Sequence, residues 1–109
     1  DKESRKSILA INAKEIPIVN DPKSPGYVDI EKIAEVTDGL SGADVAAIAN
    51  TAVSLVIHEF LDAHPEVKEA EKASEGAKVT MKHFEEAVKK VREQKNLKIG
   101  QKVVASYYR

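Results

Sequence analysis

A long stretch without charge constrains this chain more than any other feature. From Val45 to Ile57 no residue is charged, and apolar residues recur at helical spacing. A helix that is apolar nearly all round is buried on several sides. The sequence therefore predicts a central helix whose apolar positions are Val45, Ile48, Ala49, Ala52, Val53, Val56, Ile57, Phe60 and Leu61.

The segment just before this stretch has the pattern of a helix start. In a Ser-x-x-Asp capping box, the Ser41 hydroxyl accepts from the Asp44 N–H and the Asp44 carboxylate accepts from the Ser41 N–H. Between them, Gly42 and Ala43 are small enough to let a base or a phosphate approach the backbone closely. Taken alone, such a segment is more often a plain helix cap than a ligand contact.

Four further helices are expected, over about 2–13, 30–37, 65–75 and 81–94. Each begins near a residue suited to a helix N-terminus, namely Asp1, Asp29, Pro65 and Thr80. In the first of them, Arg5 and Lys6 are expected on the solvent side. We expect an all-α bundle of four to five helices, with a very short two-stranded pairing between 16–19 and 78–80 left open.

Composition excludes several functions. The 109 residues contain no Cys, which excludes a disulfide scaffold, a thiolate metal site and a cysteine nucleophile. The three histidines, His58, His64 and His83, lack metal-ligand spacing, so no metal site is expected. A formal charge of −1 gives no general attraction to nucleic acid or to an anionic membrane, and no uninterrupted apolar run has the length of a membrane span. Neither a Gly-x-Ser-x-Gly elbow nor a phosphate-binding P-loop occurs.

Several motifs together resemble the C-terminal helical lid subdomain of classical AAA+ ATPases, in the branch of the valosin-containing-protein-like unfoldases of archaeal type. The family pattern Thr-x-Gly-hydrophobic-Ser-Gly-Ala-Asp is matched in full by Thr37, Gly39, Leu40, Ser41, Gly42, Ala43 and Asp44. Flanking family positions are matched by Asp1, Arg5, Ile8, Leu9, Asp29, Ile30, Glu31, Thr80, Phe84, Glu85 and Ala87. The resemblance covers residues 1–94 and leaves 95–109 as a C-terminal tail. Since the chain lacks an initial Met and the lid pattern starts at Asp1, we expect a piece of a longer protein.

The resemblance implies the lid of a hexameric, ATP-dependent protein unfoldase. In this family the Walker motifs lie on a large subdomain, and this sequence has none, so the chain alone is expected to hydrolyse no ATP. Gly42 and Ala43 would contact ATP or ADP, whose Mg²⁺ belongs to the large subdomain. Asn12 stands where relatives place a His or Asn against the adenine, and an amide can both donate and accept there. The alternative for Asn12 is a helix C-cap.

The last residues add a second resemblance. Tyr107, Tyr108 and Arg109 fit the hydrophobic-Tyr-any-residue ending with which some ring ATPases dock into pockets of the proteasome core. An ordinary frayed terminus explains the same residues.

The resemblance implies three partners: the large subdomain of the same chain, the neighbouring subunit of a homohexamer and, through the tail, the proteasome core. It implies a cytoplasmic protein that binds neither nucleic acid nor membrane. The competing hypothesis is a free-standing helical protein–protein interaction module without a nucleotide role. The segments 21–27 and 62–79 depart from the family pattern and have no assigned role.

Overall fold

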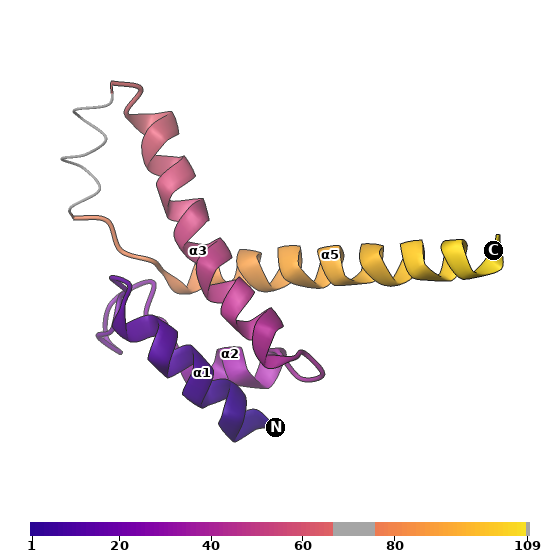
Figure 1. Cartoon of the computed structure of the whole chain (residues 1–109). Coiled ribbons are helices and arrows are strands. Elements are labelled where there is room, and N and C mark those ends of the chain that lie inside the picture. The colour runs from indigo at the N-terminus through magenta and orange to yellow at the C-terminus, as the bar shows by residue number, and fades with distance from the viewer. Residues whose placement is uncertain (67–75, 109) are drawn as a thin grey trace.

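The computed structural model describes residues 1–66 and 76–108, and within them the chain is all-α (Figure 1). The described residues form four helices: α1 (Lys2–Lys14), α2 (Ile30–Val36), α3 (Gly42–Ala63) and α5 (Met81–Tyr107). The predicted all-α bundle is confirmed. Residues 67–75, which make up most of the helix expected over 65–75, lie outside the described residues.

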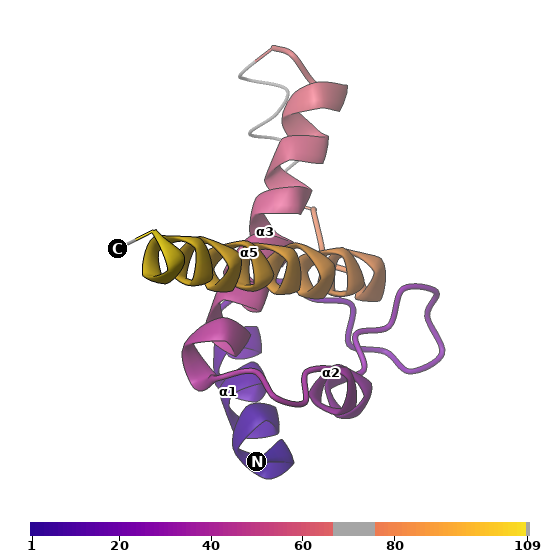
Figure 2. The ribbon, with the colours of Figure 1, turned by 90° about the vertical axis from the view of Figure 1, so that its right-hand side faces the viewer.

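Helix α3 is the centre of the fold, as the uncharged stretch predicts. The capping box is formed, with 3.1 Å from the Asp44 N–H to Ser41 Oγ and 2.9 Å from the Ser41 N–H to Asp44 Oδ2. Helices α1 and α5 both pack against α3, and α2 packs against α1 (Figures 1 and 2). The buried residues of α3 are Val45, Ile48, Ala49, Ala52 and Val56. They join a core to which α1, α2 and α5 also contribute.

By length and composition alone, α3 could cross a membrane, because an 18-residue window within it has a mean hydropathy of 1.3. Polar residues such as Asn50 and Ser54 interrupt it, so it contains no uninterrupted apolar run of that length. One such helix is weak evidence for a membrane span, since the core helix of a bundle has the same composition. Val45, Ile48 and Ala52 of α3 lie in the protein core, which accounts for part of its apolar character. The expectation of burial on several sides fails near the C-terminal end of α3, where Ile57 and Leu61 are about half exposed.

The predicted pairing between 16–19 and 78–80 is present as one isolated parallel bridge. It joins Ile18 to Val79, with hydrogen bonds from the Val19 N–H to the Val79 carbonyl (3.0 Å) and from the Val79 N–H to the Pro17 carbonyl (2.8 Å). Gly26 packs against Thr80, next to this bridge. Its φ of +85° is in the left-handed region, and a Cβ there would lie 3.2 Å from the Thr80 side chain, so this position favours glycine.

Helix α5 is longer than the sequence predicts. Its expected end lies near residue 94, whereas the helix continues to Tyr107. Its buried residues all lie in its first half: Phe84, Ala87, Val88 and Val91. The second half projects from the body (Figure 1), which raises the radius of gyration to 16.2 Å, against about 13 Å for a compact chain of this length. Val91 is the last core residue of α5, but no Pro follows to end the helix, so its backbone continues beyond the core.

Candidate functional site

The residues matched to the family motif form a loop between α2 and α3, followed by the first turn of α3. Gly39, with a φ of +82°, turns the chain after α2, as expected of a helix-terminating glycine. Leu40 is buried, and its N–H donates to the Thr37 carbonyl at 3.1 Å. Gly42 and Ala43 are exposed at the start of α3. The loop is therefore fixed by its buried residues, while the two predicted contact residues face outward.

Ile8 of α1 approaches the start of α3 and also accepts a hydrogen bond from Asn12, one helical turn further along α1. A Cβ added to Gly42 would be 3.1 Å from Ile8 Cδ1, so α1 approaches the start of α3 closely at this point. The Asn12 Nδ2 group donates to the Ile8 carbonyl at 2.8 Å. The helix that carries Asn12 thus packs at Ile8 against the start of α3, where Gly42 lies. Reading Asn12 as a helix C-cap is wrong, because α1 continues past it to a C-cap at Glu15.

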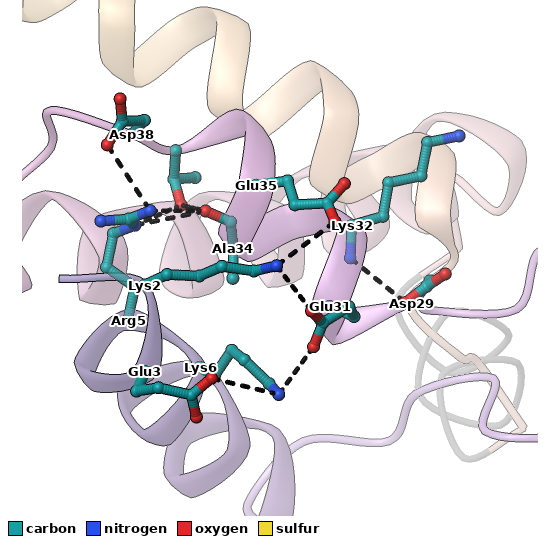
Figure 3. Close-up of polar contacts among 11 residues, drawn as sticks. Lys2, Glu3, Arg5, Lys6, Asp29, Glu31, Lys32, Ala34, Glu35 and Asp38 are labelled. Atoms are coloured by element: carbon teal, nitrogen blue, oxygen red, sulfur yellow. Dashed lines mark hydrogen bonds and ion pairs between the residues drawn. The ribbon is translucent and has the colours of Figure 1, made fainter.

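Arg5 connects α1 to the end of α2 beneath the loop (Figure 3). Its Nη2 donates to the Ala34 carbonyl at 2.9 Å, its Nε donates to Thr37 Oγ1 at 3.2 Å, and Nη2 lies 3.8 Å from Asp38 Oδ1. The expectation that Arg5 faces solvent is wrong, since only 7% of the residue is exposed. A buried guanidinium needs several acceptors, and here the end of α2 supplies them. No local sequence pattern predicts these contacts, because the acceptors belong to a different helix.

A surface ion-pair group joins α1 to α2 nearby (Figure 3). The Glu31 carboxylate lies 2.6 Å from the ammonium groups of both Lys2 and Lys6, and Lys2 also contacts Glu35 at 3.3 Å. Hydrogen bonds from Lys2 and Lys6 lower the pKa of Glu31 to about 2. These side chains are well exposed, so each pair adds little stability and mainly sets how α1 lies on α2.

Two side chains of α5 hold the loop from the other side. The Arg92 Nη2 group donates to the Val36 carbonyl at 2.7 Å and to the Asp38 carbonyl at 3.1 Å. Lys95 Nζ lies 2.8 Å from Asp44 Oδ2. The Lys95 hydrogen bond, together with the Ser41 N–H, lowers the pKa of Asp44 to about 2. No local sequence pattern assigns either residue to this loop, because their partners lie more than 50 positions away.

The start of α5 has its own capping interaction. Thr80 is the N-cap, as predicted, and its N–H donates to His83 Nδ1 at 3.0 Å. That assigns the proton of the neutral ring to Nε2, which lies 2.9 Å from Glu59 Oε2. His83 therefore connects α5 to α3. In the parts of the chain that the structure describes, no three His, Cys, Asp or Glu side chains are grouped as metal ligands.

The candidate docking residues lie at the opposite end of α5 from the body (Figure 1). Tyr107 is 82% exposed and Tyr108 is 81% exposed, with their ring centres 5.4 Å apart. Arg109 lies outside the described residues. Two separate regions therefore carry the predicted site residues: the junction of α1 with α3, and the far end of α5.

Comparison with known proteins agrees with this architecture. A family model described as the AAA+ lid domain matches residues 28–86, which include the loop and the whole of α3. The chain belongs to the AAA+ lid domain family.

Two curated archaeal proteins are similar to it. The cell division cycle protein 48 homolog of Archaeoglobus fulgidus is 41% identical over 92 residues, which cover 84% of this chain and 12% of that protein. Protein SAV of Sulfolobus acidocaldarius is 39% identical over 62 residues, covering 57% of this chain and 7% of that protein. The chain thus spans only a small part of the length of either relative.

Proposed function

We propose that this chain is the lid of a ring-forming, ATP-dependent protein unfoldase, and that Asn12, Gly42 and Ala43 contact its adenine nucleotide. The observation that carries the proposal is the close approach of Ile8 of α1 to Gly42 at the start of α3, which places Gly42 against the helix that carries Asn12. Similarity to an archaeal cell division cycle protein 48 homolog supports the choice of parent protein.

The chemistry of this junction suits a nucleotide. The first N–H groups of a helix have no partner within it. The capping box uses the N–H groups of Ser41 and Asp44, so those of Gly42 and Ala43 are left to donate to an oxygen of the ligand. Gly42 has no side chain and that of Ala43 is a single methyl group, so a ligand can reach these donors. The Asn12 amide nitrogen is held by the Ile8 carbonyl, which directs its oxygen as an acceptor for an amino group such as that of adenine.

The lid then acts by coupling rather than by catalysis. Nucleotide bound between the lid and a large subdomain favours one angle between them, and hydrolysis relaxes that angle. Only contacts that differ between the two states can produce this effect. A core helix such as α3, with its N-terminus at the nucleotide and its middle buried, transmits the change as a rigid body. Walker motifs, Mg²⁺ and the neighbouring subunit of a homohexamer belong to the longer, cytoplasmic parent.

The test is nucleotide affinity in a longer chain that includes the large subdomain. Asn12→Leu removes the amide while keeping the side-chain size, and we expect ADP to bind about tenfold more weakly, the effect of one lost hydrogen bond. Gln101→Leu, an exposed amide on the projecting half of α5, is the matched control. Equal ADP affinity of Asn12→Leu and the unmodified protein would contradict the nucleotide role.

A second proposal concerns the far end of α5, which we propose docks into the proteasome core. The supporting observation is its unusual exposure of apolar side chains, because groups of this kind mark interaction surfaces. The exposed residues are Leu97, Ile99, Val103, Val104, Tyr107 and Tyr108. Tyr108→Ala in the full-length ring should abolish its stimulation of proteasome gate opening, whereas Lys98→Ala should not. Unchanged stimulation by Tyr108→Ala would remove the proposal.

A further inference from the structure

The loop that precedes α3 is attached to α5 at both of its ends. Arg92 donates to the Val36 carbonyl, the last of α2, and to the Asp38 carbonyl in the loop. Lys95 pairs with Asp44, which itself caps Ser41 at the other end of the loop. A cation at the end of a helix is favourable both for its free carbonyls and for its dipole. Arg92 and Lys95, which we call the anchor pair, therefore bracket the segment that carries Gly42 and Ala43.

The position of the anchor pair along α5 is informative. Its two members are three residues apart, so they lie on one face of the helix. They directly follow Val91, the last buried residue of α5. Beyond Lys95 the helix extends to Tyr107 without entering the core, a length of about 18 Å at 1.5 Å per residue. A force or a partner acting on Tyr107 and Tyr108 therefore reaches the body first at the anchor pair.

We propose that Arg92 and Lys95 are positioning residues that couple the far end of α5 to the orientation of Gly42 and Ala43. Neither side chain touches the nucleotide, and both act through the loop. Occupancy at the end of α5 then changes nucleotide affinity, and nucleotide changes the affinity of the docking end by the same factor. This coupling rests on the proposed nucleotide and docking roles. The mechanical link, by which Arg92 and Lys95 hold the loop before α3, does not depend on those roles.

The mechanical link is tested on the present chain without nucleotide. Arg92→Met and Lys95→Met keep most of the aliphatic stem and remove the donors. We expect amide hydrogen exchange at Asp44 and Val45, whose N–H groups bond to Ser41, to become about fivefold to tenfold faster. Lys95→Arg should restore slow exchange, and Lys98→Met should leave it unchanged. Core amides such as that of Ala52 report global stability, and unchanged exchange at Asp44 and Val45 in both Met variants would overturn the link.

The coupling of the anchor pair to the nucleotide site is tested in the full-length ring by measuring KM and kcat for ATP separately. Loosening the loop should raise the KM for ATP about fivefold in Arg92→Met while kcat changes less than twofold. A purely structural role would instead lower the active fraction, and hence the apparent kcat, at constant KM. A KM unchanged by either Met variant overturns the coupling. Asn12→Leu in the same assay tests the nucleotide site separately, so failure of the site and failure of the anchor pair are distinguishable.

Discussion

Replacing Asp44 by Asn tests how the start of α3 is held. The carboxylate accepts from the Ser41 N–H and pairs with Lys95, and these contacts lower its pKa from an ordinary value of 3.8 to about 2. Asn keeps an acceptor for the Ser41 N–H but loses the charge that Lys95 pairs with. The substitution therefore removes the ion pair while retaining most of the cap.

The pKa sets the magnitude and the pH range of the effect. A pKa lowered by this amount corresponds to about 2 kcal/mol of folding stability at neutral pH. Because the Asp44 side chain is 24% exposed and Lys95 is 37% exposed, solvent screening reduces the expected value to about 1 kcal/mol. The group has a lowered folded-state pKa, so its contribution is complete above the unfolded pKa of 3.8 and is lost as the pH falls toward 2. At pH 3 about half should remain.

Urea denaturation of the unmodified chain and of Asp44→Asn at pH 7 and pH 3 measures this directly. The difference in the free energy of unfolding should fall from about 1 kcal/mol at pH 7 to about half that value at pH 3. In a Lys95→Met background, Asp44→Asn should cost much less, because the partner is already absent. An equal cost at the two pH values, or no coupling between the two substitutions, would refute the assignment of Asp44 and Lys95 as a stabilising pair.

Two further substitutions test the packing behind the site. Arg5→Met removes the charged donor from the Ala34 carbonyl, which then keeps only the Thr37 hydroxyl, and from Thr37 Oγ1. Urea denaturation should show a loss of about 2 kcal/mol, and a loss below 0.5 kcal/mol would contradict the role of Arg5 in joining α1 to α2. Ile48→Ala opens a cavity in the protein core and should lower the free energy of unfolding by about 2–5 kcal/mol. Ile57→Ala, on the same helix but 50% exposed, should lower it by about half as much or less. Similar losses for the two variants would show that α3 is not oriented as described.

The parts of the fold that the sequence predicts correctly depend on short-range interactions. The box formed by Ser41 and Asp44 involves residues three positions apart, and the core face of α3 follows from helical periodicity. The sequence does not decide the Ile18–Val79 bridge, because its two segments are too short to show a clear alternation.

The wrong or missing predictions concern contacts between distant segments. From the sequence alone, Arg5 is predicted to face solvent, because its hydrogen-bond partners Ala34 and Thr37 lie 29 and 32 positions away. Arg92 meets Val36 across 56 positions, so no local pattern could assign it to the loop. The predicted length of α5 is too short for a different reason. The prediction relies on the helical spacing of core residues, and the last core residue precedes the end of the helix.

The candidate site divides in the same way. A local motif and the family resemblance point to Gly42 and Ala43, whereas the position of Asn12 relative to them depends on how α1 crosses α3 near Ile8. Helix periodicity does not predict that crossing. The resemblance implies Asn12, and the packing of Ile8 against Gly42 joins the helix of Asn12 to the start of α3.

The most direct measurement is the chemical shift of the Gly42 and Ala43 amides on addition of ADP to a chain that includes the large subdomain. We expect both amide resonances to move, with that of the Asn12 side-chain amide, while the amides of Lys23 and Ser24, in the loop before α2, stay in place. If Gly42, Ala43 and Asn12 do not move at saturating ADP, the nucleotide role is wrong, and the chain acts as a helical protein–protein interaction module.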